Sequence, residues 1–163
     1  MKYIRVNYVD AEPMTFGEFK EKFPTSGGAN QNRPDDDEGY VITYRKGEPN
    51  EYVSWCPKAE FDAVSRPIDG MTFGMAIESM KNGKKVARRG WNGKGMYIWV
   101  MPRSTITNCP NITDPHLKAI SDANDGTVVF VGSVRMKTAT GEVLTGWLAS
   151  QTDMLSEDWM IVE

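Results

Sequence analysis

The apolar positions between residues 71 and 83 recur at the spacing of one helix face. Thr72 is suited to cap the N-terminus of this helix, and Gly83 is suited to end it. The apolar side chains fall three and four positions apart, at Phe73, Ala76, Ile77 and Met80. This periodicity predicts an amphipathic helix that packs one side against a sheet.

Strands are predicted where apolar and polar residues alternate. Residues 84–89 and 95–101 flank the pair Asn92-Gly93, which favours a tight hairpin turn. Further strands are expected at residues 2–9, 39–44, 52–55, 127–136, 142–148 and 160–162, and the segments 127–136 and 142–148 are expected to pair as a second hairpin. Short helices are expected at residues 16–23 and after Pro57, Asp114 and Ser150.

A short internal repeat indicates two modules. The sequence MTFG occurs at residues 14–17 and again at residues 71–74, and each copy opens a stretch with helical spacing. Proline and glycine in residues 65–70 interrupt regular structure, so the chain is expected to divide into residues 1–69 and 70–163. The predicted fold class is α+β: an antiparallel twisted sheet packed with short helices, preceded by a small α+β N-terminal module.

Composition narrows the possible classes of function. The 163 residues are 40% hydrophobic and 25% charged, with a net charge of -3, which is typical of a globular protein. No apolar run has the length of a membrane span and no apolar leader is present, so a cytoplasmic protein without membrane contact is expected. Cys56 and Cys109 lack the spacing of a metal site, so two reduced thiols, no metal and no cofactor are expected. The acidic balance argues against a nucleic-acid polymer as partner.

Positive charge is concentrated between residues 79 and 113, where the chain has no acidic residue. Strand alternation places Arg88 on one face and Arg89 on the other, so only some of these cations can face one ligand. Two interpretations stay open: an anionic ligand, or pairing with acids elsewhere such as Asp153, Glu157 and Asp158. The cations concerned are Lys81, Lys84, Lys85, Arg88, Arg89, Lys94 and Arg103.

Residues 88–97 combine cations, glycines, an amide and an aromatic ring. Trp91 is able to stack on a nucleotide base, an interaction worth about 1–3 kcal/mol per base in single-strand binders. Gly93 and Gly95 would let a ligand approach backbone N–H groups, and Lys94 would meet a phosphate. The alternative is a structural hairpin in which Trp91 anchors the core. The spacing of glycine and lysine does not fit a Walker loop.

A second polar cluster begins the helix expected after Ser150. Ser150 and Asp153 fit a capping box, which requires no ligand. Gln151, Thr152 and Asp153 are also suited to reading hydroxyl groups and base edges. This cluster is therefore a candidate binding surface as well as a helix start.

Catalytic interpretations are weaker than a binding role. The single histidine, His116, follows a proline at a predicted helix start and is expected on the surface. Asp153 and Glu157 would supply paired carboxylates for a nucleotide-processing hydrolase. A third interpretation is a virion-associated structural module whose aromatic side chains form a protein interface. A binding protein that is not an enzyme is favoured.

Two stretches of the chain resemble a known family of phage proteins. They are MTFGMAIESMKNGKKVARRGWNGKGMYIW, which begins at residue 71, and GWLASQTDMLSEDWMIVE at the C-terminus. Together they resemble the family called Thoeris anti-defence protein 2, over most of residues 70–163. Residues 1–69 look like an appended phage module, similar to small domains that end in a segment like Trp55-Cys56-Pro57-Lys58.

The resemblance implies a sponge for a nucleotide immune signal. Such proteins bind glyco-cyclic ADP-ribose, the messenger of the Thoeris system, without degrading it, and so keep the effector inactive in the host cell cytoplasm. Some members also bind cyclic dinucleotides at a separate site, and members form homotetramers with ligand pockets between subunits. Carried over by motif, the ligand-binding residues are Trp91, Asn92, Met96, Gln151, Thr152 and Asp153, to which charge adds Arg89 and Lys94.

Overall fold

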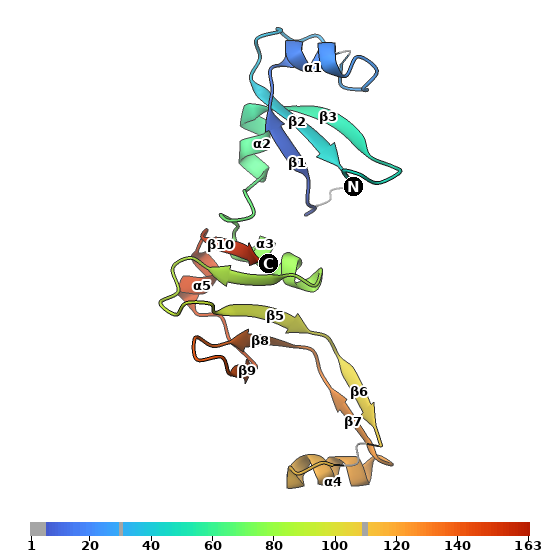
Figure 1. Ribbon diagram of the computed structural model, residues 1–163, viewed down its shortest axis with the longest axis vertical. Coiled ribbons are helices and arrows are strands. Elements are labelled where there is room, and N and C mark those ends of the chain that lie inside the picture. Colours follow the sequence, from blue (N-terminus) through green and yellow to red (C-terminus); the bar gives the residue numbers. More distant parts are fainter. Residues whose placement is uncertain (1–5, 30, 109–110) are drawn as a thin grey trace. The chain divides into compact units, whose positions relative to one another are not determined.

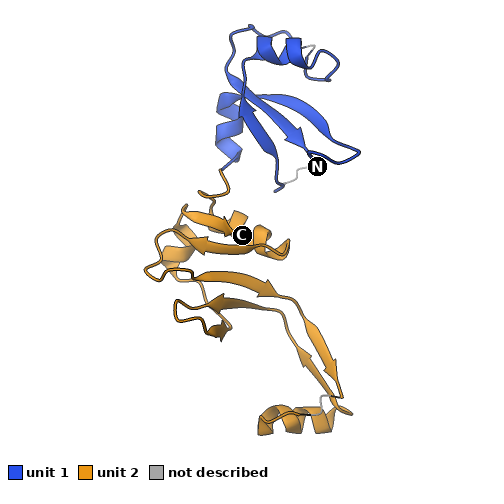
Figure 2. Cartoon of the chain, viewed as in Figure 1, with its two compact units in different colours: residues 1–66 blue, residues 67–163 orange. Residues whose placement is uncertain are grey.

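The structure, a computed structural model, describes residues 6–29, 31–108 and 111–163. The chain divides into two compact units, residues 1–66 and 67–163 (Figure 2). Residues 67–70 were expected in a linker but belong to the second unit, where the Ile68 carbonyl accepts a hydrogen bond of 3.0 Å from the Ile161 N–H. Cys56 is a free thiol, and Cys109 lies outside the described residues. None of the described helices is long and apolar enough to cross a membrane.

The first unit is a three-stranded antiparallel sheet with two helices. Its elements are β1 (Asp10–Pro13), α1 (Phe16–Lys22), β2 (Gly39–Tyr44), β3 (Tyr52–Pro57) and α2 (Lys58–Val64), with strand order β1-β2-β3 (Figure 1). Thr15 and Glu18 form a capping box at the start of α1. The aromatic side chains of Phe16, Phe19 and Trp55 form the centre of a separate core.

The strand predicted at residues 2–9 is wrong in its described part. Residues 6–9 have no regular structure, residues 2–5 lie outside the described residues, and the first strand begins at Asp10. The register explains the difference, because Asp10 pairs with Thr43 and β2 ends one residue later at Tyr44. Among the described residues before Asp10, only Val9 would therefore lie opposite a residue of β2, and residues 6–8 lie beyond its end.

The second unit contains a five-stranded antiparallel sheet with two helices on one side. Its strands lie in the order β10-β4-β5-β8-β9, and α3 packs against β4, β5, β10 and α5 (Figure 1). The elements are α3 (Phe73–Lys81), β4 (Lys85–Arg88), β5 (Tyr97–Met101), β8 (Ser133–Lys137), β9 (Val143–Thr145), α5 (Gln151–Leu155) and β10 (Trp159–Val162). The predicted α+β class with antiparallel sheets and short helices is confirmed.

The core of the second unit forms where α3 meets the sheet. The predicted helix is confirmed, since Thr72 caps it, Gly83 follows it at a φ of 81°, and Ala76 and Met80 are buried. These side chains pack against Val86, Ile98, Met136 and Trp159 of the sheet. Each large apolar side chain that is removed from water in this way stabilises the fold by about 1.5–3 kcal/mol.

An arm extends from this sheet as a two-stranded ribbon. It consists of β6 (Ser104–Thr107), β7 (Thr127–Phe130) and α4 (Pro115–Ala123), which Asp114 caps as predicted. The strand predicted at residues 127–136 is wrong as a single element: β7 pairs with β6, which the sequence analysis missed, while β8 pairs with β5 and β9. The break lies opposite the segment between β5 and β6, where Pro102 has no N–H to donate to the ladder.

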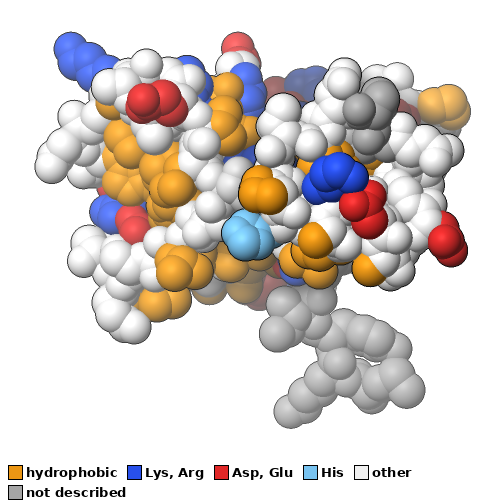
Figure 3. Space-filling view, turned by 90° about the horizontal axis from the view of Figure 1, so that it is seen from below, with side chains coloured by type: hydrophobic (Ala, Val, Ile, Leu, Met, Phe, Trp, Pro, Cys, Tyr) orange, Lys and Arg blue, Asp and Glu red, His pale blue; other side chains and the backbone are white. Residues whose placement is uncertain are grey.

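The α4 end of the molecule exposes apolar side chains. Figure 3 shows this end, with hydrophobic side chains in orange and the single histidine, His116, exposed in pale blue as expected. Leu117 and Ile120 lie among the apolar residues of α4, and Ile120 is 48% exposed. The short ribbon offers little surface for α4 to cover.

Candidate functional site

The candidate loop, residues 89–96, joins β4 to β5. These strands pair through Val86 and Ile98, so the loop is longer than the tight Asn92-Gly93 turn that the sequence predicted. A Cβ atom on Gly93 would lie 2.2 Å from the Met96 sulfur and 2.9 Å from the Ala139 Cβ. The side of Gly93 on which a side chain would lie is therefore filled by Met96 and Ala139. The sequence had predicted that Gly93 would let a ligand approach the backbone.

Trp91 lies at the boundary between this loop and the core. Its half-buried ring packs edge-on against the rings of Trp147 and Trp159, with centroid distances of 6.0 and 5.4 Å. The indole N–H donates a hydrogen bond of 3.1 Å to Oδ1 of Asp153 in α5. Trp91 thus has the anchoring role considered in the sequence analysis, and it also brings the loop to the start of α5.

Asp153 is the centre of the hydrogen bonds at the start of α5. The capping box predicted from Ser150 and Asp153 is confirmed, with Oδ2 of Asp153 accepting from the Ser150 N–H at 3.0 Å and its Oγ at 2.7 Å. The other oxygen, Oδ1, accepts from Nη1 of Arg88 at 2.8 Å and from Trp91. Because a carboxylate offers about four acceptor positions, these four bonds use its capacity.

The same contacts keep Asp153 ionised. Burial raises the pKa of this carboxyl, but hydrogen bonds from Ser150, Arg88 and Trp91 outweigh burial and lower the pKa from 3.8 to about 2. At neutral pH the side chain is therefore an anion whose acceptor positions are all filled from within the chain.

Arg88 joins Asp153 to a second carboxylate. Its Nε donates to Oδ1 of Asp158 at 2.8 Å, and Oδ2 of Asp158 accepts a bond of 2.7 Å from the Gly90 N–H. The hydrogen bond from Arg88 lowers the pKa of Asp158, and the Gly90 N–H adds to this effect against the opposing effect of burial. The pairing interpretation of the basic segment is thus confirmed for Arg88. Arg88 and Asp158 are not among the site residues predicted from the sequence, although strand alternation had separated Arg88 from Arg89.

The remaining candidate residues surround this contact along the chain. Arg89 is exposed and donates to the Asp69 carbonyl at 2.7 Å, and Met96 is half-buried against the core. No hydrogen bond or ion pair within the described part of the chain links Asn92 or Lys94 to α5. The exposed candidates are Arg89, Asn92, Lys94, Gln151 and Thr152.

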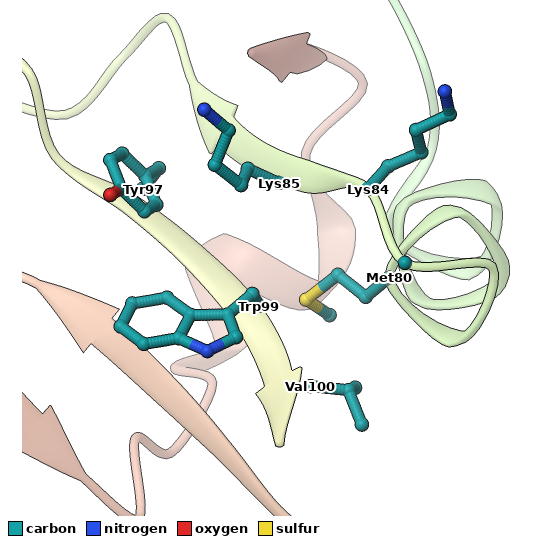
Figure 4. A pocket seen from close by; sticks show the side chains of 7 residues that line it. Met80, Lys84, Lys85, Tyr97, Trp99 and Val100 are labelled. Carbon is teal, nitrogen blue, oxygen red and sulfur yellow. The ribbon is translucent and has the colours of Figure 1, made fainter. Parts of the chain in front are cut away.

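Two cavities of the second unit lie away from the candidate residues. One, of about 190 Å³, lies between the start of β4 and β5 (Figure 4), and the other, of about 230 Å³, lies between the ribbon and α4. The first is lined by Met80, Gly83, Lys84, Lys85, Tyr97, Trp99 and Val100. The second is lined by Ile106, Asn111, Ile112, Thr113, Asp114, Leu117, Val128 and Phe130. Neither cavity includes a candidate residue.

Comparison with known proteins decides the family. The profile of the Thoeris anti-defense 2-like domain matches residues 71–162. The chain belongs to this family. A relative named Thoeris anti-defense 2, from Bacillus phage SP01, is 35% identical over 92 residues, which are 56% of this chain and 94% of that protein. The resemblance inferred from the two sequence stretches is thereby confirmed.

All the candidate residues lie inside the Thoeris anti-defense 2-like domain, and residues 1–66 form a unit outside it. The Trp91–Asp153 bond joins two parts of this domain that are distant in sequence. In the described residues, no group of three histidine, cysteine or acidic side chains is arranged to hold a metal ion. The polar side chains that the site offers to a ligand carry indole, amide, hydroxyl and cationic groups.

Proposed function

We propose that this protein binds glyco-cyclic ADP-ribose and sequesters it intact in the host cell cytoplasm, so that the Thoeris effector stays inactive. The observation that carries the proposal is the direct contact between Trp91 and the first turn of α5, within the Thoeris anti-defense 2-like domain. This contact places an aromatic ring next to exposed amide and hydroxyl side chains. Those are the groups that an adenine ring and ribose hydroxyls require.

Each candidate residue has a distinct task in this proposal. The exposed part of the Trp91 ring stacks on the adenine, with Met96 beside it as an apolar wall. Gln151 and Thr152 bind ribose hydroxyls or the base edge, together with Asn92. The exposed cations Arg89 and Lys94 meet the two phosphate groups, arginine by paired N–H donors and lysine as a point charge.

Binding without cleavage is supported by the state of Asp153. A carboxyl with a pKa of about 2 carries no proton to donate at neutral pH, and its oxygens already accept four hydrogen bonds. Glu157 is exposed and makes no hydrogen bond or ion pair in the described residues. In the carboxylate pair of the hydrolase alternative, Asp153 is therefore not protonated, and no described group orients the side chain of Glu157.

Completion of the pocket by a second copy is part of the proposal. The exposed candidate residues lie at the surface of one chain, while Leu148, which precedes α5, and Leu155, the last residue of α5, are 87% and 81% exposed. Large exposed apolar side chains next to a candidate site are typical of an interface. A homotetramer that buries these leucines would convert the surface into an enclosed pocket between subunits.

Calorimetry with glyco-cyclic ADP-ribose tests this function. A sponge must bind well below the messenger concentration, and a nanomolar Kd corresponds to about 12 kcal/mol. We expect such a Kd, and intact messenger in the mass spectrum after the complex is heated. Cleaved products would favour the hydrolase, whereas no binding together with co-purification on phage particles would favour a virion module. Lys118→Ala, which removes an exposed cation of the arm that pairs with Asp122, should leave this Kd unchanged.

Cyclic dinucleotides are proposed as a second ligand, at the cavity shown in Figure 4. Tyr97 and Trp99 project from the same side of β5, with ring centroids 5.6 Å apart. The ammonium groups of Lys85 and Lys137 lie 5.3 and 5.9 Å from the Tyr97 ring centre, and no described lining residue is acidic. Aromatic faces beside cations suit bases linked by phosphates. Cyclic dinucleotides should bind to protein saturated with the messenger, and Tyr97→Ala should remove this second binding alone.

A further inference from the structure

A partly buried cluster of one arginine and two carboxylates is hydrogen-bonded to the candidate loop, residues 89–96. Arg88, at the end of β4, has a side chain only 10% exposed, and it lies between the carboxylates of Asp153 and Asp158, which are 11% and 29% exposed. One carboxylate comes from α5 and the other from the turn before β10. The planar guanidinium meets each acid with a separate N–H donor at 2.8 Å, which fixes both acids relative to the sheet.

Each of these acids also holds the loop. Asp158 accepts from the Gly90 N–H at 2.7 Å, and Asp153 accepts from the Trp91 indole at 3.1 Å. Two consecutive loop residues are therefore attached, through two different carboxylates, to the same arginine. Backbone bonds also hold the start of the loop, since the Arg89 N–H donates to the Asp158 carbonyl at 3.1 Å and the Trp91 N–H donates to the Arg88 carbonyl at 3.3 Å.

Gly90 shows how closely the loop approaches this cluster. A Cβ atom at this position would lie 2.8 Å from Oδ2 of Asp158 and 3.1 Å from Nη2 of Arg88. An added methyl group would therefore displace the carboxylate or the loop. The contact requires a residue without a side chain.

We propose that Arg88, Asp153 and Asp158 are positioning residues, which hold residues 89–96 in the conformation that presents Trp91 to its ligand. Asp153 accordingly acts through Trp91 and does not contact the ligand, because its acceptor positions are filled. This inference rests on the proposed function, since it assigns the loop to messenger binding. It replaces the direct contact that the family resemblance had implied for Asp153.

A variant that breaks a bond of the cluster should lower the affinity for the messenger, because fewer molecules then have the loop in the conformation that binds. The apparent Kd equals the intrinsic Kd divided by the fraction of molecules in the competent conformation. If a variant leaves about a tenth of the molecules competent, the apparent Kd rises about tenfold. The saturated complex keeps the same structure, because the ligand contacts themselves are unchanged.

Two variants test the proposal, one by changing a carboxylate of the cluster and the other by adding a methyl group to the loop. Asp158→Asn replaces one acceptor oxygen with an NH2 donor, and because Arg88 Nε and the Gly90 N–H bind different oxygens of Asp158, one of these two bonds is lost. Gly90→Ala leaves every charge in place and separates the loop from the Asp158 carboxylate, so it keeps the test valid if Asp158→Asn does not fold. The matched controls are Glu157→Gln, the neighbouring exposed acid, and Gly74→Ala in α3, where a Cβ would meet only Thr72 Oγ1 at 3.9 Å.

The assay combines calorimetry with the NMR signal of the Trp91 indole N–H, using glyco-cyclic ADP-ribose as the probe. We expect both variants to raise the Kd about tenfold, to accelerate hydrogen exchange of this indole in the free protein, and to reach the wild-type indole shift at saturation. Both controls should match wild type in all three measurements.

Each contrary result has its own meaning. An unchanged Kd with accelerated exchange would show that the cluster orders the loop without serving binding. A different bound-state indole shift would show that Asp158 or Gly90 contributes to the ligand contacts, and the positioning role would be overturned. If wild-type protein binds no messenger, the proposed function fails, whereas unaltered exchange in the free variants refutes the positioning role by itself.

Discussion

Stability in acid should depend on Asp153 by a predictable amount. The pKa of this carboxyl is 3.8 in its ordinary state and about 2 in the folded protein. A pKa that is lowered on folding stabilises the fold above the unfolded-state pKa, and this contribution is lost as the pH falls through the folded-state pKa. Since one pH unit corresponds to about 1.4 kcal/mol, Asp153 adds about 2 kcal/mol to the free energy of unfolding above pH 4.

Urea unfolding of wild type and Asp153→Asn between pH 5 and pH 2 measures this contribution. Tryptophan fluorescence reports mainly on the second unit, which contains Trp91, Trp99, Trp147 and Trp159, while Trp55 is the one tryptophan of the first unit. Wild type should lose about 2 kcal/mol more than Asp153→Asn over this range, while Glu157→Gln should behave as wild type. Parallel curves for wild type and Asp153→Asn would show that Asp153 is not held ionised, and would remove the argument against an acid role.

Three further predictions concern binding, assembly and the independence of the units. Trp91→Ala should raise the Kd for glyco-cyclic ADP-ribose about ten- to a hundredfold in calorimetry, because the stacking of one base is lost. The mass of the assembly in light scattering should not change, and an unaltered Kd would exclude stacking. Leu148→Asp should dissociate the assembly in light scattering, and an unchanged mass would place the interface elsewhere. Gly39→Ala should unfold the first unit, as seen in Trp55 fluorescence, because its Cβ would lie 2.4 Å from the Cys56 carbonyl oxygen. Messenger binding by residues 67–163 should survive Gly39→Ala, and its loss would show that the two units act together.

The elements that could be predicted from the sequence are those determined by neighbouring residues. Thr72 and the apolar spacing of α3 act within a few turns, and the capping box of Ser150 and Asp153 spans three positions. Both predictions are confirmed because caps and amphipathic faces need little information from distant parts of the chain.

The features that could not be predicted depend on pairing between distant segments. Thr127–Phe130 and Ser133–Lys137 look like one strand, and only the partners β6 and β5 divide them. Pairing of the basic segment with distant acids was likewise one of two interpretations of the sequence. The sequence did not show that Arg88 would be the cation that binds both Asp153 and Asp158, 65 and 70 residues away. Of the four internal bonds of Asp153, the two from Ser150 follow from the predicted capping box, whereas those from Arg88 and Trp91 come from a segment distant in sequence.

The crystal structure of the protein with glyco-cyclic ADP-ribose tests the central claim most directly. We predict an unbroken messenger whose adenine lies against the ring of Trp91, with Gln151 or Thr152 within hydrogen-bond distance of its hydroxyl groups. A messenger bound away from both Trp91 and α5, or density for cleaved products only, would contradict the account.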